Sequence, residues 1–307
     1  MTMDGPGRGK VTLSGASGML GSVIGAALAA RGVALLRLVR REEREPGELC
    51  WNPATKEIQV EELEGIRAAV HLSGANVASR RWTAKYKREM EESRVGSTRL
   101  LAEALAKLKT PPQVLVTASA IGFYGDCGDQ IVDEDSAAGR GYFPKLCTAW
   151  EEAAKPAEEA GIRVVHLRFG MVVGREGGAM ARLAPLFKLG LGGRLGDGTQ
   201  WMSWVSETDA VSVALWALEN PNVNGPLNVV APNPVTNAEF TRELARAVHR
   251  SALLPAPAFA LRLAFGEMAD EALLASTRAV PKRLIQAGFT FAHPTLAEAL
   301  ASALAKE

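Results

Sequence analysis

Cysteine and histidine are scarce in this chain of 307 residues, which limits the metal and redox chemistry open to it. The three cysteines lie far apart, and no pair has the spacing of a disulfide framework, a zinc site or a redox motif: Cys50, Cys127 and Cys147. Two of the four histidines, His71 and His166, lie inside apolar runs and are interpreted as core residues. We therefore predict no metal site and a reducing, cytoplasmic location.

Long apolar runs and an excess of charge of one sign are also missing. No run reaches the roughly 20 residues that span a bilayer, and the polar start of the chain lacks the apolar stretch of a secretory signal. The 35 basic and 34 acidic residues give a net charge of +1, which provides no broad field for nucleic acid or an anionic membrane. We expect a small-molecule substrate, no nucleic acid and no membrane partner. The sequence leaves the oligomeric state open.

What the sequence does contain is an alternation of short β-branched runs with longer helical patterns. Strands are expected at 10–14, 33–39, 68–72, 114–118 and 164–168, and the main helices between them at 19–31, 83–107 and 143–160. Strands that alternate with helices form βαβ units around a parallel sheet. The sequence therefore predicts an α/β fold, a Rossmann-type doubly wound parallel sheet.

The pattern changes after Gly170, where a glycine-rich stretch begins. Further helices are expected at 180–188, 209–219 and 237–250, the last one capped by Thr236 with Glu239 three residues on. We predict a disordered tail at 1–9, an NADP-binding Rossmann domain with substrate-lobe insertions at 10–235, and a helical C-terminal segment at 236–307. The later segments should form a smaller substrate lobe at the C-terminal edge of the sheet.

The strongest motif is the run GASGMLG, residues 15–21, between the first expected strand and the first expected helix. A bound diphosphate needs backbone close by, unpaired N–H groups and the positive end of a helix dipole. Gly21 lets the helix pack tightly on the strand. The alternative is a tight strand-to-helix connection without a ligand. We predict that the residues contacting a nucleotide here are Gly15, Ser17, Gly18, Met19 and Leu20.

The end of the second strand indicates which nucleotide is bound. An acidic residue there would bind the adenosine ribose and favour NAD, but this sequence has Arg40 and Arg41. A guanidinium pairs with the 2′-phosphate of NADP through charged, forked hydrogen bonds. The alternative is that both arginines are solvated and balance Glu42, Glu43 and Glu45. Arg40 is closer to the strand, so we predict NADP(H) as the cofactor and Arg40 as its 2′-phosphate ligand.

Further segments resemble one protein family over almost the whole chain. Those at 71–75 (HLSGA), 118–125 (ASAIGFYG) and 167–174 (LRFGMVVG), with the glycine spacing at 15–21, resemble the extended short-chain dehydrogenase/reductase superfamily of sugar-nucleotide epimerases and dehydratases. Those at 150–151 (WE), 177–180 (GGAM), 236–240 (TNAEF) and 280–284 (VPKRL) resemble its atypical "epimerase family protein" group, whose substrate is generally unassigned. The resemblance implies further residues around the cofactor: Leu72, Ser73, Gly74, Glu89, Arg94 and Met171.

The catalytic pattern of that superfamily is incomplete here. Its members usually combine a Ser or Thr that orients the substrate, a Tyr that transfers a proton, and a Lys four residues later that lowers the pKa of the Tyr. Ser119 fits the first role. With the helix aligned on Glu151, Phe143 and Cys147 replace the Tyr and the Lys. Tyr124 is a substitute candidate for proton transfer; the alternative is that it only lines the pocket.

Three functions follow from this combination. The first is an NADP(H)-dependent oxidoreductase of the atypical extended short-chain type, acting on an unknown small carbonyl or alcohol. The second is a sugar-nucleotide epimerase or dehydratase, which the missing Tyr and Lys disfavour. The third is a non-catalytic NADPH-binding sensor or scaffold. The sequence names neither the substrate nor the reaction direction.

Overall fold

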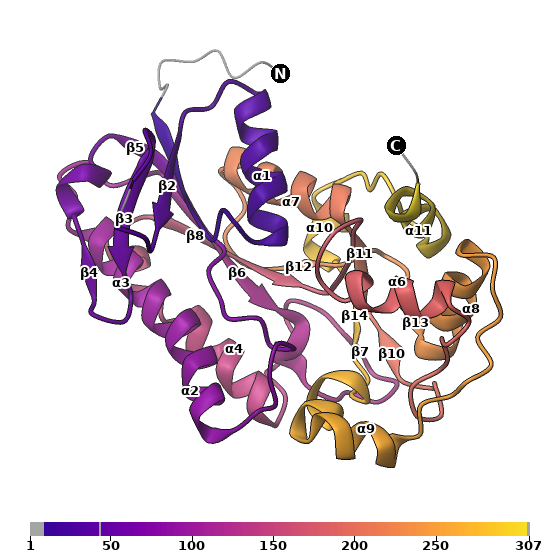
Figure 1. Ribbon diagram of the computed structural model, residues 1–307. Coiled ribbons are helices and arrows are strands. Elements are labelled where there is room, and N and C mark those ends of the chain that lie inside the picture. The colour runs from indigo at the N-terminus through magenta and orange to yellow at the C-terminus, as the bar shows by residue number, and fades with distance from the viewer. Residues whose placement is uncertain (1–8, 43, 306–307) are drawn as a thin grey trace.

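The computed structural model describes residues 9–42 and 44–305 and has one large sheet at its centre (Figure 1). The eight strands of this sheet follow the order β12-β8-β6-β5-β1-β2-β3-β4. Their bounds are β1 (Lys10–Ser14), β2 (Leu35–Val39), β3 (Glu48–Asn52), β4 (Glu57–Ile58), β5 (Ile66–His71), β6 (Val114–Ala120), β8 (Arg163–Phe169) and β12 (Gly225–Val229). Of the expected tail at 1–9, all but Gly9 lies outside the described residues.

The strand pairing confirms the predicted doubly wound sheet. All neighbouring strands of the large sheet are parallel except β3 and β4. The order of strands reverses at β1, with β2 and β3 on one side and β5, β6 and β8 on the other. In such sheets the crevice for a ligand lies outside the carboxyl ends of the strands at the reversal point. The fold therefore points to the ends of β1 and β5.

Helices cover both faces of the sheet, as the apolar strands predict. Helices α1 (Met19–Ala30) and α7 (Glu207–Glu219) contribute Ile24, Leu28 and Val213 to the core on one face. On the other face, α3 (Ser97–Ala106) and α5 (Lys155–Glu159) pack against strand residues such as Leu115. Adjacent residues of β6 thus point into different cores, and Val116 belongs to the first.

A smaller C-terminal lobe has a core of its own, to which Trp204 and Phe240 contribute. The strands outside the large sheet pair into two-stranded sheets: β9 (Met171–Val173) with β11 (Trp204–Ser206), β10 (Trp201–Met202) with β13 (Val235–Thr236), and β7 (Ile131–Val132) with β14 (Arg278–Ala279). Its helices are α6 (Met180–Lys188), α8 (Asn237–Ala247), α9 (Ala258–Phe265), α10 (Lys282–Gln286) and α11 (Leu296–Leu304). The predicted capping box of Thr236 and Glu239 starts α8.

Two long predicted helices are divided in the structure. The helix expected at 83–107 consists of α2 (Ala84–Glu91), the π-helical turn η2 (Glu92–Gly96) and α3. The helix expected at 143–160 consists of α4 (Tyr142–Glu152) and α5. Pro156 is the second residue of α5, where its missing N–H and fixed φ are tolerated, so a new helix begins there. Within the described ranges, no helix has the length and apolar character needed to cross a bilayer.

Candidate functional site: a nucleotide cradle at the end of β1

The turn between β1 and α1 holds the backbone open for a ligand. Gly15 has φ +70, and a Cβ there would lie 2.7 Å from the carbonyl oxygen of Leu72. Gly18 is the N-cap of α1 and has no side chain, while its own N–H donates to the Gly15 carbonyl at 2.9 Å. The first N–H groups of a helix carry partial positive charge and hold an anion when no side chain caps them. The turn therefore has the form of a phosphate cradle.

The two arginines after β2 differ in their partners. Arg41 donates to both carboxylate oxygens of Glu48, at 2.7 and 2.6 Å, and this contact helps to lower the pKa of Glu48. Arg40 is exposed at the end of β2, and none of the residues that the structure describes pairs with its guanidinium. The alternative in which both arginines serve as surface charges thus fits Arg41, whereas Arg40 is available for an anionic ligand.

The loop after β5 lies directly against the glycine turn. The register of β1 and β5 places Ser14 beside His71, so the following residues Leu72 and Ser73 meet Gly15. A Cβ at Gly74 would lie 3.2 Å from the guanidinium carbon of Arg94. The structure therefore brings together the predicted residues of the first turn and of the second loop at one edge of the sheet.

Arg94 comes from the π-helical turn η2 and fixes this loop. Its guanidinium donates to the Ala75 carbonyl at 2.9 Å and stacks over the Trp150 ring at 5.1 Å. Burial lowers the pKa of Arg94. Glu89, by contrast, lies on α2 with 49% of its side chain exposed, and its carboxylate is 3.9 Å from the Arg80 guanidinium. No contact in the described structure ties Glu89 to the glycine turn.

The remaining residues predicted to contact the cofactor differ in how far the protein buries them. Ser17 is exposed at the turn, and Leu20 packs partly into the core. Met19 begins α1, and a Cβ at Gly177 would lie 3.1 Å from its side chain, so the loop before α6 covers it. Met171 begins β9, where its N–H donates to the Ser203 carbonyl at 3.0 Å. Met171 thus lies just beyond the end of β8.

A buried polar network lies at the ends of β6 and β8. The register pairs Ser119 with Arg168, and both are 3% exposed. Ser119 Oγ donates to Glu151 Oε1 at 2.6 Å, and Arg168 donates to both oxygens of Glu151 at 2.8 Å. The bidentate pair satisfies a charge that would be costly to bury alone. Ser119 is therefore held by α4 through Glu151.

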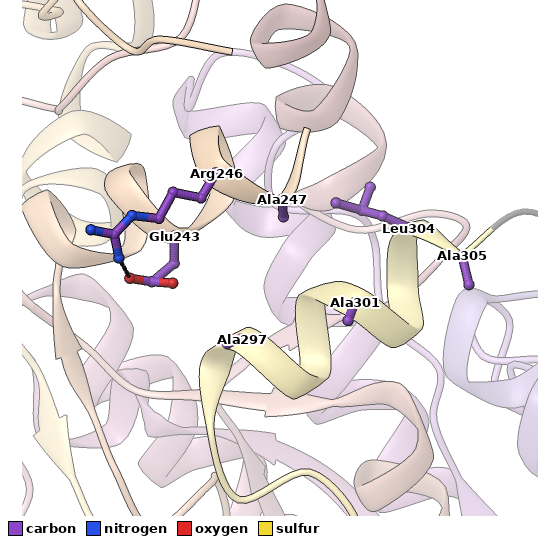
Figure 2. Close-up of a pocket in the computed structure, with 7 residues that line it drawn as sticks. All are labelled: Glu243, Arg246, Ala247, Ala297, Ala301, Leu304 and Ala305. Carbon is purple, nitrogen blue, oxygen red and sulfur yellow. Dashed lines mark hydrogen bonds and ion pairs between the residues drawn. The ribbon is translucent and has the colours of Figure 1, made fainter. Parts of the chain in front are cut away.

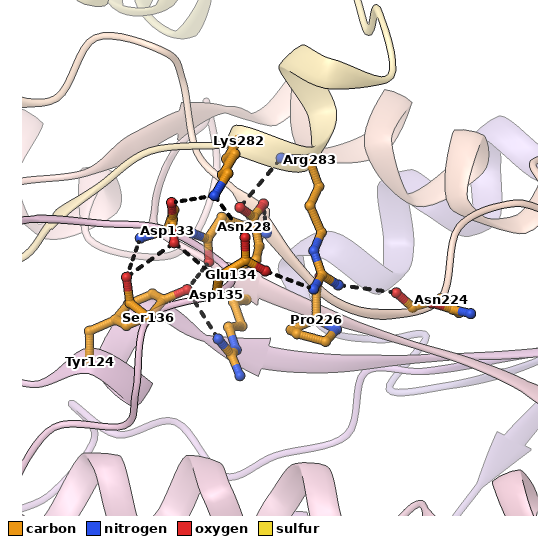
Figure 3. A network of polar contacts seen from close by, with 11 residues as sticks. Tyr124, Asp133, Glu134, Asp135, Ser136, Asn224, Pro226, Asn228, Lys282 and Arg283 are labelled. Atoms are coloured by element: carbon orange, nitrogen blue, oxygen red, sulfur yellow. Dashed lines mark hydrogen bonds and ion pairs between the residues drawn. The ribbon is translucent and has the colours of Figure 1, made fainter.

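Tyr124 is the second predicted catalytic residue, and it belongs to the same network. Its hydroxyl donates to Asn228 Oδ1 at 2.8 Å and accepts from Arg168 at 3.0 Å. Figure 3 shows the Tyr124 hydroxyl close to Asn228. The side chain is 2% exposed, and burial raises the pKa of Tyr124 to about 12. Such a phenol is poorly placed for proton transfer to a ligand.

A distinct open pocket of about 340 Å³ lies between α8 and α11 (Figure 2). Its charged groups are Glu243 and Arg246, which pair with each other at 2.7 Å. The rest of its lining is Ala247, Ala297, Ala301, Leu304 and Ala305. None of the predicted site residues contributes to this pocket, so it is not the candidate site.

The model of the NAD dependent epimerase/dehydratase family matches residues 11–230, which contain the glycine turn, Arg40 and the buried network. This chain belongs to that family. A second model, described as Domain of unknown function (DUF1731), matches residues 256–303. The predicted family resemblance is thereby confirmed.

Several proteins match nearly the whole of this chain. An epimerase family protein of Mycobacterium bovis is 45% identical over 94% of this chain and 96% of its own. The solved structure of human epimerase family protein SDR39U1 with NADPH has a TM-score of 0.87 at 34% identity, covering 95% of this chain and 98% of that chain. A nucleoside-diphosphate sugar epimerase from Corynebacterium glutamicum has a TM-score of 0.81 at 34% identity, covering 96% of this chain and 58% of that chain.

Phe143 and Cys147, which the alignment of the helix on Glu151 predicts in place of Tyr and Lys, both lie on α4. The Phe143 ring lies 4.9 Å from that of Trp82, and a Cβ at Gly122 would lie 3.3 Å from Phe143 Cβ. Cys147 is 2% exposed, and burial raises the pKa of its thiol to about 12. In this family member, neither residue offers a proton donor near neutral pH.

Three residues of the site had no role assigned from the sequence. The Trp-Glu pair at 150–151 was part of the resemblance, but no pattern linked Glu151 to Ser119. Arg168 could have been suspected, because a charged residue in a strand buried on both faces needs a partner. Glu271 gave no signal: it accepts from the N–H groups of Tyr142 and Phe143 at 3.0 and 3.1 Å, from far along the chain.

Proposed function

We propose that this chain binds NADP(H) at the carboxyl edge of its sheet and acts as an oxidoreductase on a small carbonyl or alcohol. The observation that carries the proposal is the uncapped glycine turn together with the guanidinium of Arg40, which pairs with none of the described residues. In support, the human relative SDR39U1, aligned over 95% of this chain, was crystallised with NADPH.

The chain's own contribution to binding would come from three places. The N–H groups at the start of α1 would hold the diphosphate, since Gly15 and Gly18 keep side chains away. Arg40 would pair with the 2′-phosphate. Arg94 would act indirectly, because it fixes the loop of Ser73 and Gly74 against the turn. Bound NADPH would supply a hydride to a carbonyl carbon, whose oxygen would take a proton from solvent; in the reverse direction NADP⁺ would accept the hydride from an alcohol that gives its hydroxyl proton to solvent.

Calorimetry with matched variants tests the cofactor part of the proposal. Arg40→Ala should weaken NADPH binding by about tenfold or more, because a hydrogen bond to a charged group contributes about 1.5–3 kcal/mol. NADH binding should change little. Arg41→Ala is the control, since Glu48 already pairs with Arg41. Equal losses for NADPH and NADH in Arg40→Ala would contradict the assignment of the 2′-phosphate.

At the substrate end, we assign Ser119 as the hydroxyl that orients the substrate oxygen and Tyr124 as a positioning residue. Ser119 lies near the end of β6 and directs its proton to Glu151. It thus presents lone pairs, which suit a substrate hydroxyl. Tyr124 would act indirectly, through its hydrogen bonds with Arg168 and Asn228. Phe143 and Trp82 would form an apolar wall that excludes water.

A substrate panel tests the chemistry. Oxygen-free incubation with small aldehydes, ketones and diphosphate sugars should oxidise NADPH with at least one carbonyl compound. With that compound, Ser119→Ala should lower kcat while leaving the affinity for NADPH unchanged. Turnover of diphosphate sugars without net NADPH oxidation would favour an epimerase instead.

A second candidate function is a non-catalytic NADPH-dependent binding protein. The observation that favours it is the enclosure of the Ser119 and Tyr124 hydroxyls, at 3% and 2% exposure, with Phe143 at the Tyr position. It predicts NADPH affinity, no turnover on any carbonyl compound, and a partner whose capture depends on NADPH. A pull-down with and without NADPH separates this function from the oxidoreductase.

A further inference from the structure

Helix α9 is apolar on nearly every side and yet lies at the surface. Its sequence, AFALRLAF, contains a single charged residue, Arg262. Leu261 is buried, but Phe259 and Leu263 are 73% and 76% exposed. A helix that is hydrophobic all round is normally covered by protein or by lipid. Helix α9 forms an outer edge of the molecule in Figure 1, and none of the described residues covers Phe259 and Leu263.

A second exposed apolar segment lies beside the stretch that leads into α9. The Leu254 N–H donates to the Gly192 carbonyl at 3.4 Å, and the Ala256 N–H donates to the Arg194 carbonyl at 2.9 Å. The chain around 192–194 therefore runs next to 254–256, two residues before α9 begins. We define the apolar surface as the exposed side chains of these segments: Leu186, Leu189, Leu191, Leu253, Leu254, Phe259, Leu263 and Phe265.

The concentration of exposed side chains here is unlike the rest of the chain. A single exposed leucine is ordinary. Of the ten large apolar side chains that are exposed among the described residues, however, eight belong to the apolar surface. Contiguous exposed apolar patches of more than a few hundred Å² mark sites for a protein or a membrane. Exposed apolar side chains on two neighbouring segments make the apolar surface the candidate docking site of the described chain.

The charge around the apolar surface distinguishes between these partners. Residues 180–196 and 247–266 contain five basic side chains and no acidic one, in a chain whose net charge is only +1: Arg182, Lys188, Arg194, Arg250 and Arg262. The acidic residues that follow these segments have partners of their own: Asp197 accepts from the N–H and the hydroxyl of Thr199, Glu267 pairs with Lys87, and Asp270 pairs with Arg262. Arg182, Lys188, Arg194 and Arg250 therefore carry positive charge that no ion pair with a described acidic side chain balances. A second copy docked through the same surface would bring basic groups together, which is unfavourable. An anionic lipid surface would complement them.

We propose that the apolar surface docks this chain onto an anionic lipid bilayer without crossing it. Phe259, Leu263 and Leu253 would enter the boundary between headgroups and acyl chains, while Lys188 and Arg194 would contact lipid phosphates. The sequence predicted no membrane partner because no single run is long or basic enough. The surface is assembled from two separate segments, so it is visible only in the folded chain. The proposal does not depend on the cofactor or the reaction.

Vesicle flotation with the full chain tests the proposal. The protein should float with phosphatidylcholine vesicles that contain phosphatidylglycerol, but not with vesicles of phosphatidylcholine alone. Added salt should weaken the binding. The double variant Phe259→Gln, Leu263→Gln should bind at least about tenfold more weakly, because burying one Leu or Phe accounts for roughly that factor. Phe259 and Leu263 are exposed, so this variant should keep its fold, as circular dichroism can verify.

The matched control is Ile131→Gln, Ile285→Gln, which removes two side chains that are each 54% exposed outside the apolar surface. It should float like the wild type. Lys188→Glu, Arg194→Glu should lose binding to the phosphatidylglycerol vesicles. Absence of flotation, or flotation unchanged by Phe259→Gln, Leu263→Gln, would overturn the proposal. The proposal would also be overturned if the wild type does not bind lipid but forms a dimer, seen by light scattering, and Phe259→Gln, Leu263→Gln abolishes that dimer.

Discussion

The absence of a Cβ atom at Gly21 allows α1 to lie close to the turn that follows β1. A Cβ at Gly21 would lie 2.0 Å from the Gly15 carbonyl oxygen, a distance that no side chain can have without backbone movement. That carbonyl also accepts the Gly18 N–H at 2.9 Å, so it is fixed by the turn itself. The absence of a side chain at Gly21 is thus a condition for both the fold and the phosphate cradle.

Replacing Gly21 should therefore be costly even with the smallest side chain. We expect Gly21→Ala to lower the free energy of unfolding by about 1–3 kcal/mol, the usual cost of overpacking, and to weaken NADPH binding. Urea denaturation and calorimetry measure the two effects. Gly96→Ala is the control, because a Cβ at Gly96 would meet no atom within 4 Å and the backbone there is helical. Equal stability of the two variants would contradict this account of the turn.

His71 illustrates a buried titratable residue that serves the core. It is fully buried, and the hydroxyl oxygens of Ser14 and Ser97 lie 2.6 and 3.1 Å from its ring nitrogens. Burial lowers the pKa of His71 from 6.5 to about 3, so the ring is neutral in the folded chain at neutral pH. The interpretation of His71 as a core residue agrees with this burial.

Stability should fall as the pH drops through the range between these two pKa values. The unfolded chain binds a proton at His71 below about pH 6.5, whereas the folded chain does not, so this residue alone removes about 1.4 kcal/mol per pH unit. Between about pH 7 and about pH 5, wild type should lose roughly 2 kcal/mol more than His71→Gln. Urea denaturation at both pH values measures the difference. The same pH dependence in the two proteins would show that His71 is not the residue responsible.

Some residue roles can be predicted from the sequence and others cannot. The sequence predicts cofactor contacts at the glycine run and Arg40 because turn geometry and phosphate chemistry demand particular residue types next to a strand end, and these contacts stay a prediction until NADPH binding is measured. Ser119 and Tyr124 were named for their hydroxyls, but whether a hydroxyl is free depends on distant partners such as Glu151 and Asn228. Those partners are brought together only by the packing of α4 and β12 around β6.

At the scale of elements, α4 depends on a cap from the C-terminal lobe. The Glu271 carboxylate accepts from the N–H groups of Tyr142 and Phe143 at the start of α4. Gly141 has φ +131, and a Cβ there would lie 2.6 Å from that carboxylate, so glycine makes room for it. The segment that matches a domain of unknown function thus holds the helix that carries Phe143, Cys147 and Glu151.

Removing this cap should loosen α4 measurably. We expect Glu271→Ala to reduce the free energy of unfolding by about 1–2 kcal/mol, as for loss of other helix N-caps. Glu267→Ala provides the comparison: its ion pair with Lys87 is partly exposed, so its loss should cost less than about 1 kcal/mol. Chemical denaturation of both variants gives the answer. A smaller effect for Glu271→Ala than for Glu267→Ala would refute the capping role.

Element positions followed well from periodicity, and their ends followed less well. The strand at 10–14 and the helix at 180–188 match β1 and α6 residue for residue, because sharp turns bound them. The π-helical turn between α2 and α3 has no periodic signature, and it is the turn that directs Arg94 toward Ala75. The exposed face of α9 was equally hidden, since an apolar run does not say which side is covered.

At the scale of the whole molecule, the strand order follows from the alternation of strands and helices. Right-handed βαβ crossovers place β1 at the point of reversal and collect the carboxyl ends of β1, β5, β6 and β8 at one edge. The small sheets of the C-terminal lobe were beyond prediction, because pairs such as β14 with β7 join segments far apart in the chain. Lys282 and Asp133, which lie just after β14 and β7, form an ion pair in the network of Figure 3.

A crystal structure of the chain grown with NADPH tests the central claim most directly. We predict density for the diphosphate against the backbone N–H groups at the start of α1, and for the 2′-phosphate within hydrogen-bonding distance of the Arg40 guanidinium. NADPH bound elsewhere, or well-folded crystals without dinucleotide density at saturating NADPH, would contradict the claim.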